Sequence, residues 1–233
     1  MSISAHLDQV RQAIAAAARS AARPPGSVLL IAVSKTFGPD AVIAAADAGQ
    51  RAFGENYLQE ALDKQLAVAQ TRPDLALEWH FIGPIQSNKT RPIAEHFDWV
   101  HAVDREKIAQ RLSDQRPAHL PPLQICLQVN VSGEDSKSGV TPDELLPLAR
   151  AVSAMPHLRL RGLMAIPEPA EDAERQRAPF IQLRQLAQQL REAGIDTDTL
   201  SMGMSADMVA AIAEGATMVR IGTAIFGKRD YAK

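Results

Sequence analysis

The sequence predicts an α/β protein that folds as a single (β/α)8 barrel of the TIM type, with an extra helix at its N-terminus. Eight short apolar segments alternate with segments of helical periodicity, and strands that alternate with helices pair in parallel. No linker-like change in composition interrupts this alternation, so residues 1–233 are expected to form one domain. Eight such strands favour a closed barrel, and an open α/β sheet is the alternative.

The N-terminal segment is expected to be a helix that packs on the body of the protein. Ile3, Leu7, Val10 and Ile14 recur at helical spacing. After the last predicted strand only residues 222–233 remain, which are too few for a full helix and a tail. We therefore expect the N-terminal helix to help complete the outer ring of helices.

Apolar runs and helix signals define the first half of the alternation. Pro39 is favourable in the first turn of a helix, and Gly49 marks the end of the same helix. The predicted strands are 28–33, 51–53, 78–82 and 99–103, and the predicted helices are 39–49, 55–70, 88–96 and 105–115.

The second half opens with a strong helix signal. Thr141 and Glu144 have the spacing of a capping box, with Pro142 at the first helical position. The predicted strands are 124–129, 158–165, 199–202 and 218–221, and the predicted helices are 141–153, 171–193 and 206–214.

Composition and charge exclude several classes of protein. The chain has 25 basic and 27 acidic residues, a formal charge of −2, and 46% hydrophobic residues, which gives no electrostatic case for nucleic acid or an anionic membrane as main partner. The longest aliphatic run, 28–33, is far too short to span a membrane. The N-terminus lacks the pattern of a secretory signal, so a cytoplasmic location is expected. Cys126 lies in an apolar run and is interpreted as a buried, inert thiol.

Several polar residues directly follow predicted strands, and the chemistry of such barrels lies at the carboxyl ends of the strands. Lys35 and Asn56 follow the first two strands. A partly desolvated lysine at the barrel mouth has a lowered pKa and is a usable nucleophile toward a carbonyl, with which it forms a Schiff base. The alternative for Lys35 is a solvated lysine that begins a loop.

The end of the chain resembles a phosphate site of a barrel. Loops after strands seven and eight often bind phosphate, and Gly222 and Thr223 follow strand eight. Ser205, at the start of the predicted helix after strand seven, has a hydroxyl to offer to the same anion. The alternatives are an ordinary N-cap for Ser205 and a tight turn for Gly222 and Thr223.

The remaining features do not define a second site. The six histidines form no metal-binding motif, and His80 and His101 are interpreted as structural residues of neighbouring strands, so no metal site is expected. The loop 132–139, which contains Lys137, has the composition of a mobile lid or of a plain solvated loop. Its role stays open.

Eight short motifs together resemble the pyridoxal phosphate homeostasis proteins. They are AVSK (32–35), FGENY (53–57), WHFIG (79–83), QSNK (86–89), SKSG (136–139), RGLM (161–164), LSMGMSAD (200–207) and RIGTAIFG (220–227). The matches occur in order and cover nearly the whole chain. The fold of that family is similar to the N-terminal barrel of alanine racemase.

The resemblance implies a role for each candidate site residue. It implies that Lys35 carries pyridoxal 5′-phosphate (PLP) as a Schiff base and that Asn56 touches the cofactor. It also implies that Arg220 faces the pyridine nitrogen. Ser205, Gly222 and Thr223 are implied to hold the phosphate.

The expected function is PLP binding in cofactor homeostasis, by buffering or delivery, with an influence on amino-acid and keto-acid pools. A cation near the ring nitrogen disfavours its protonation and weakens the ring as an electron sink. Nothing follows the barrel to supply an opposite-face base, and the only tyrosines are Tyr57 and Tyr231, so no catalytic residue is assigned. We expect a monomer that makes transient contact with apo PLP enzymes. The alternatives are a minimal amino-acid racemase that uses Lys35 alone and a cofactor-free enzyme acting on a phosphorylated metabolite.

Overall fold

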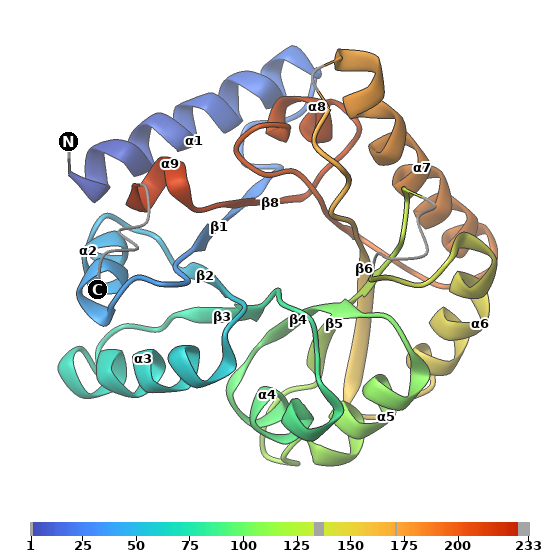
Figure 1. Cartoon of the computed structure of the whole chain (residues 1–233), viewed down its shortest axis with the longest axis horizontal. Helices are drawn as coiled ribbons and strands as arrows, with labels where there is room; N and C mark the ends of the chain where they lie inside the picture. Colours follow the sequence, from blue (N-terminus) through green and yellow to red (C-terminus); the bar gives the residue numbers. More distant parts are fainter. Residues whose placement is uncertain (1, 133–137, 171, 228–233) are drawn as a thin grey trace.

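The computed structural model describes residues 2–132, 138–170 and 172–227 as a closed, all-parallel barrel of eight strands inside a ring of helices (Figure 1). The strands are β1 (Leu29–Val33), β2 (Ala52–Glu55), β3 (Glu78–Phe81), β4 (Trp99–Val103), β5 (Leu123–Gln128), β6 (Leu158–Met164), β7 (Thr199–Ser201) and β8 (Met218–Ile221). The helices are α1 (Ile3–Ser20), α2 (Pro39–Asp47), α3 (Leu58–Thr71), η1 (Ser87–Lys89), α4 (Thr90–His96), α5 (Glu106–Gln115), α6 (Pro142–Ser153), α7 (Ala173–Glu192), α8 (Met208–Ala213) and α9 (Thr223–Phe226).

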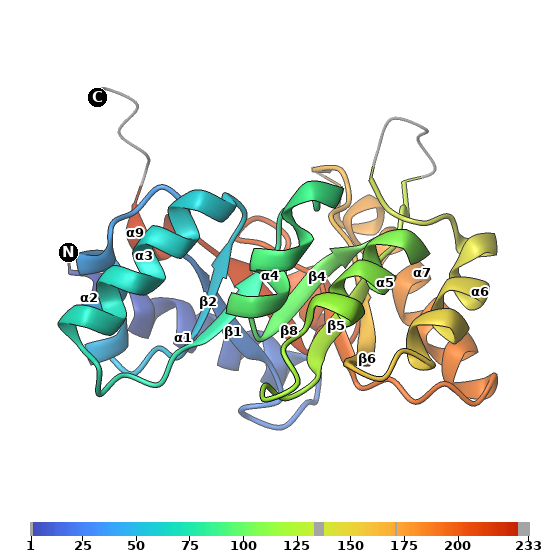
Figure 2. The ribbon, with the colours of Figure 1, turned by 90° about the horizontal axis from the view of Figure 1, so that it is seen from below.

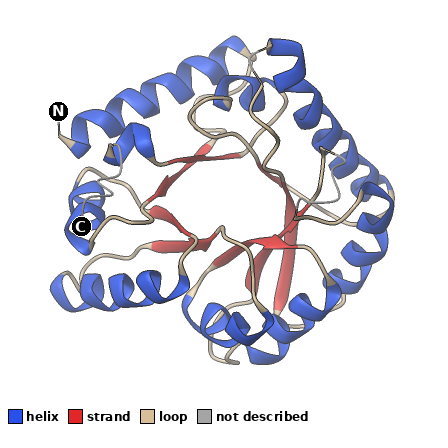
Figure 3. Ribbon diagram, viewed as in Figure 1, coloured by secondary structure: helices blue, strands red, loops and turns tan. Residues whose placement is uncertain are grey.

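Closure of the barrel decides between the two predicted architectures. The first strand pairs with the last, and in this register Leu29 lies opposite Met218 and Ile31 opposite Arg220. Figure 3 shows the unbroken ring of strands that results. The predicted (β/α)8 barrel is thus confirmed, and the open sheet is excluded.

The N-terminal helix completes the outer ring, as the sequence predicts. Helix α1 packs between α8 and α2 and also contacts α9 (Figure 1). Its inward face carries the buried residues Leu7, Val10 and Ile14. The ring of His6 adds a hydrogen bond of 3.0 Å between its Nδ1 and the carbonyl of Ile225.

Of the boundaries that differ from the predictions, two lie near the candidate site. Strand β2 continues to Glu55, where the sequence predicts the start of a helix, because Glu55 is a fully buried ion-pair partner. Helix α8 begins at Met208 rather than at residue 206. The carboxylate of Asp207 accepts a 2.6 Å hydrogen bond from the backbone of Met204, which stabilises a turn and delays the helix. Ser205 lies in this turn and is not an N-cap.

A further difference concerns the end of the chain, where one short helix follows the last strand. Helix α9 is a single turn of four residues that begins at Thr223, directly after Gly222. Four residues carry too little periodicity to be recognised in the sequence.

The core has two layers, because successive side chains of a strand point to opposite faces. The larger apolar cluster joins strand residues such as Leu30 and Ala32 to helix residues such as Val42 of α2, and so lies between the strands and the helices. Figure 2 shows the helices around the outside of the strands. The smaller cluster fills the barrel interior and consists of Ile31, Ala52, Trp99, Ala102, Cys126, Met164 and Met218. Cys126 is fully buried, and burial raises its pKa to about 12, which agrees with the interpretation as a buried thiol.

Among the described residues, no helix is both long and apolar enough to cross a membrane.

Candidate functional site

All six predicted site residues line one cavity at the carboxyl rim of the barrel. The cavity has a volume of about 370 Å³ and lies over the ends of six adjacent strands, β6, β7, β8, β1, β2 and β3. Its described lining comprises Val33, Lys35, Phe37, Asn56, Ile82, Ile166, Met204, Ser205, Ala206, Arg220, Gly222, Thr223 and Gly227. The volume is in the range of small-molecule sites.

A larger hollow of about 620 Å³ lies beside the loop that follows β6. Its lining includes Pro167, Pro169 and Pro179 and none of the six predicted residues. We therefore take the smaller cavity as the candidate site.

Lys35 is half-buried and projects from the segment directly after β1. The two residues on either side of it are tied to neighbouring elements. The backbone N–H of Ser34 donates to the carbonyl of Gly54 at 3.1 Å, and its hydroxyl donates to Glu55 at 2.6 Å. The backbone N–H of Thr36 donates to Glu60 at 2.6 Å. The backbone that carries Lys35 is therefore fixed from both sides.

Lys64 of α3 is the centre of this support. Its side chain is only 2% exposed, and its ammonium contacts Glu55 at 2.6 Å, Glu60 at 3.0 Å and the carbonyl of Ser34 at 2.8 Å. Burial raises the pKa of Glu55, and the ammonium of Lys64 opposes that shift. A buried cation with three oxygen partners is the arrangement in which a buried charge is tolerated.

Thr36 has a backbone conformation that needs such support. Its φ of +69° lies in the left-handed region, which is rare for a β-branched residue. The hydrogen bond to Glu60 satisfies the N–H of this strained residue. Strain of this kind is concentrated at functional sites, and here it immediately follows the candidate nucleophile.

Arg220 is a buried cation held at the inner wall of the cavity. Its Nη1 donates to the hydroxyl of Ser201 at 2.7 Å, and its Nη2 donates to the carbonyl of Ala165 at 3.0 Å. Burial lowers its pKa to about 10, and the charge of Asp207 opposes that shift. The guanidinium is therefore protonated at neutral pH and fixed in orientation.

Asn56 offers an acceptor without a partner in the protein. Its Oδ1 is buried and has no hydrogen-bond partner, while the residue lines the cavity. A buried polar atom left unpaired costs free energy. A ligand that donates a hydrogen bond at this point would remove that cost.

Ser205, Gly222 and Thr223 form the side of the cavity built by the loops after β7 and β8. Ser205 and Thr223 are exposed, so their hydroxyls are accessible to a ligand. A Cβ atom on Gly222 would lie 3.2 Å from the carbonyl oxygen of Val33. Glycine thus lets the loop after β8 pass close to β1.

Sequence reasoning missed Glu60 and Lys64, and it gave no supporting role to Ser34 and Glu55, which it placed only within motifs at the strand ends. A signal for Lys64 was present, because it shares the inward stripe of α3 with Ala61 and Val68. Glu60 and Lys64 also have the i, i+4 spacing of a helical ion pair. The lid hypothesis refers to the loop 132–139, of which residues 133–137, including Lys137, lie outside the described residues.

Comparison with known proteins decides the family. A pyridoxal phosphate homeostasis protein of Pseudomonas aeruginosa is 62% identical over 229 residues, which is 98% of this chain and 96% of the relative. One from Vibrio cholerae is 57% identical over 232 residues, covering 100% of this chain and 98% of the relative. The chain belongs to the pyridoxal phosphate homeostasis protein family. The resemblance found in the sequence is thereby confirmed.

A family model and solved structures also match the chain. The model of the alanine racemase N-terminal domain matches residues 5–230. PipY of Synechococcus elongatus, solved with PLP bound, is 38% identical, with a TM-score of 0.83 over 97% of this chain and 100% of that protein. Alanine racemase of Corynebacterium glutamicum is 19% identical, with a TM-score of 0.66 over 97% of this chain and 62% of that enzyme, and shares the fold.

Proposed function

We propose that this chain binds PLP in the cavity at the carboxyl rim and serves PLP homeostasis by holding and releasing the cofactor. The observation that carries the proposal is the convergence of Lys35, Arg220 and the other four predicted residues on one cavity of about 370 Å³. The names of the relatives and the PLP bound to PipY support the choice of ligand.

The lining of the cavity fits the parts of PLP. Lys35 offers a primary amine for the aldehyde, to which we propose it links covalently. Arg220 faces the ring nitrogen, and the unpaired Oδ1 of Asn56 offers an acceptor to the ring substituents. Side chains at the mouth such as Ile166 and Met204 are apolar and exposed, and suit contact with the ring. Ser205, Gly222 and Thr223 hold the phosphate.

The residues favour holding PLP over turning over amino acids. When bound, PLP supplies an aldehyde that condenses with amines and a ring that withdraws electrons. Arg220 is protonated at neutral pH and disfavours a proton on the ring nitrogen, because two positive charges would then be neighbours. Of the described residues that line the cavity, only Lys35 and Arg220 are titratable. Neither is a second base on the opposite face of the ring.

A site of this kind serves to buffer a reactive aldehyde and deliver it. Release needs only reversal of the link to Lys35, and the cavity opens on the rim of the barrel. We propose that the recipients are apo PLP enzymes that meet the protein transiently, in the cytoplasm.

Borohydride reduction followed by peptide mass mapping tests the covalent link. Reduction converts the link into a stable amine, so we expect a phosphopyridoxyl group on the peptide that contains Lys35. Lys35→Ala should abolish this adduct, and Lys107→Ala, at an exposed lysine of α5, should leave it unchanged. Absence of any adduct in the wild type with excess PLP would refute the covalent site.

Exchange of the Cα proton of free amino acids in heavy water distinguishes a carrier from a racemase. We expect the PLP-loaded protein to show no sustained exchange above free PLP. Steady exchange that disappears in Lys35→Ala would replace the carrier by a racemase.

A further inference from the structure

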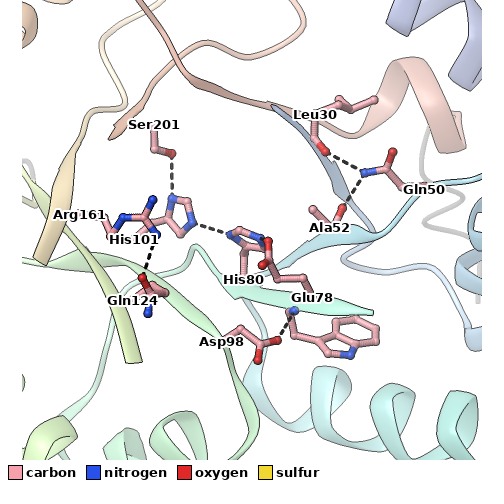
Figure 4. A network of polar contacts seen from close by, with 11 residues as sticks. Leu30, Gln50, Ala52, Glu78, His80, Asp98, His101, Gln124, Arg161 and Ser201 are labelled. Carbon is pink, nitrogen blue, oxygen red and sulfur yellow. Dashed lines mark hydrogen bonds and ion pairs between the residues drawn. The ribbon is translucent and has the colours of Figure 1, made fainter. Parts of the chain in front are cut away.

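A chain of polar side chains crosses the interior of the barrel and ends at Arg220. The hydroxyl of Ser201, which accepts from Arg220, lies 2.8 Å from Nδ1 of His101. Nε2 of His101 lies 2.9 Å from Nδ1 of His80, and Nε2 of His80 lies 2.8 Å from Glu78. Figure 4 shows the contacts that join Ser201 to His101 and His101 to His80, with Glu78 beside His80. We call these four residues, Ser201, His101, His80 and Glu78, the interior relay.

The interior relay connects opposite ends of the barrel. Glu78 is the first residue of β3 and its side chain is 45% exposed, whereas Ser201, His101 and His80 are fully buried. Both rings pack on Trp99, the ring of His80 stacked with an interplanar angle of 15° and the ring of His101 tilted at 39°. Among the described residues no cluster suitable for a metal ion is found, so the two histidines need another explanation.

The charges at the two ends impose a direction on the protons. Arg220 can only donate, so Ser201 accepts from it and has its own proton available for Nδ1 of His101. The proton of His101 is then on Nε2 and points to Nδ1 of His80. The proton of His80 is likewise on Nε2 and points to the Glu78 carboxylate. Every donor and acceptor is matched when both rings are neutral, from the cation at one end to the anion at the other.

The electrostatics agree with this direction. Burial, with the charges of His80 and Arg220, lowers the pKa of His101 well below its ordinary value, so this ring is neutral. The hydrogen bond from His80 lowers the pKa of Glu78, so the carboxylate is charged. The reverse direction would require a protonated Glu78. It would also make His101 donate to Ser201, whose hydroxyl proton would then have no acceptor within the relay.

We propose that Ser201, His101, His80 and Glu78 are positioning residues, which hold Arg220 in orientation and connect it to a counter-charge at the opposite end of the barrel. The part that concerns the bound cofactor rests on the proposed function. A second proton on His80 would occupy its Nδ1, and His101 would then have to accept at Nε2 and carry its proton on Nδ1. Ser201 would no longer donate to His101. Protonation near one rim is thereby coupled to the groups that hold Arg220 at the other.

Other charged or titratable groups face the two ends of the relay. The charge of Arg161 of β6 lowers the pKa of Glu78, and the charge of Glu78 raises the pKa of Asp98, which precedes β4. Arg51 lines the same hollow as Glu78. At the other end, Asp207 and Cys126 oppose the lowering of the pKa of Arg220 by burial. A matched control must therefore alter a carboxylate at the Glu78 end that is not part of the chain. Asp74, in the loop that leads into β3, is suitable, because it is 61% exposed and its ion pair is with Arg72, which is not a contact of the relay.

Nitrogen NMR of the ligand-free protein tests the direction of the relay. Long-range proton–nitrogen correlations report which ring nitrogen carries the proton. At about pH 9, where an ordinary histidine is neutral, we expect both rings to carry their proton on Nε2. Both rings protonated on Nδ1 at the higher pH would overturn the proposal.

PLP titration of matched variants tests the connection to the site. Glu78→Gln keeps an acceptor for His80 and removes the charge at a half-exposed position where folding is preserved. We expect it to raise the dissociation constant of PLP about two- to tenfold, the size of coupling between residues in one network. Asp74→Asn should leave the constant unchanged. Equal constants for the two variants would refute the proposal, whereas failure of the wild type to bind PLP would refute the proposed function and leave the NMR result standing.

Discussion

At the scale of single residues, the strongest support for the candidate nucleophile comes from a second lysine. Lys64 does not line the cavity, but it contacts Glu55 and the carbonyl of Ser34. Together with the hydrogen bond from Thr36 to Glu60, these contacts fix the segment around Lys35. Two lysines of the same site thus have different tasks. The buried one is held by carboxylates, and the one at the mouth faces the cavity.

Lys64→Met should destabilise the protein strongly. It removes the ammonium but keeps the length of the side chain, and leaves Glu55 buried without its cation. Breaking a buried pair on one side costs about 3–5 kcal/mol in the free energy of unfolding, measured by urea titration. The double variant Lys64→Met with Glu55→Gln should recover part of that loss. Equal stability of the wild type and Lys64→Met would show that the pair does not support the segment.

Gly222 is predicted to be a steric requirement of the phosphate side of the cavity. A side chain there would meet the carbonyl of Val33, so Gly222→Val should push the loop after β8 away from β1. We expect PLP affinity to fall about tenfold, which corresponds to the usual cost of overpacking. Gly38→Ala is the control, because a Cβ at Gly38 would meet nothing within 4 Å and its φ is −75°. Equal losses in the two variants would refute the steric explanation.

At the scale of elements, the apolar periodicity of the sequence predicts most strands and helices. Boundaries that depend on tertiary contacts are not predicted. All eight strands and the long helices follow from apolar patterns and caps, including the capping box at Thr141. The end of β2 did not follow, because Gly54 and Glu55 are poor strand formers in isolation. Gly54 is required there because the side chain of Ile31 would lie 2.9 Å from any Cβ, and Glu55 is needed by Lys64.

The candidate site shows the same division. Lys35, Asn56 and Gly222 could be found because they directly follow strands, and the resemblance to a family gave each a role. Lys64 and the interior relay could not, because their meaning depends on partners that are distant in the chain. Ser201 and His101 are 100 residues apart and meet only when the barrel closes.

The ion pair between β6 and the start of β7 gives a prediction about pH. Arg161 donates two hydrogen bonds to Asp198, at 2.9 and 2.8 Å, and these lower the pKa of Asp198 in the native protein. The resulting stability is present above the ordinary pKa of an aspartate and is lost as the pH falls through the lowered native value. Asp198→Asn should therefore be less stable at pH 7, by about 1 kcal/mol or less because the pair is largely exposed.

Urea unfolding at neutral pH and at about pH 2 checks this prediction, since aspartates are mostly protonated at the lower pH. The difference between the wild type and Asp198→Asn should decrease toward zero at the lower pH. A difference that stayed constant with pH would show that the asparagine acts by packing rather than by charge.

At the scale of the whole molecule, the residues that support the site lie in a different part of the fold from the mouth of the cavity. The helices and the barrel interior bury the groups that fix Lys35 and Arg220, while the cavity opens on the carboxyl rim. All the residues to which we assign a PLP contact come from one chain. Nothing in their arrangement requires a residue from a second copy.

The described surface also argues for a monomer. Its large exposed apolar side chains are Leu29, Tyr57, Leu66, Ile166, Met204 and Val209. Ile166 and Met204 belong to the mouth of the cavity. Leu29 lies in β1 and Val209 in α8, while Tyr57 and Leu66 lie nine residues apart, at the N-cap and in the middle of α3. Stable dimers need a contiguous apolar patch, whereas single exposed apolar residues are normal for monomers.

Light scattering after gel filtration should therefore give a mass near 25.2 kDa, the mass of one chain, with and without PLP. PLP should bind with one molecule per chain and with an affinity independent of protein concentration, because each cavity is complete in itself. A mass of two chains together with an affinity that rises with protein concentration would contradict this, and would place part of the PLP site at an interface between copies. Delivery of a cofactor by transient contact requires that the rim of the barrel is accessible to the recipient. In a monomer the rim is accessible.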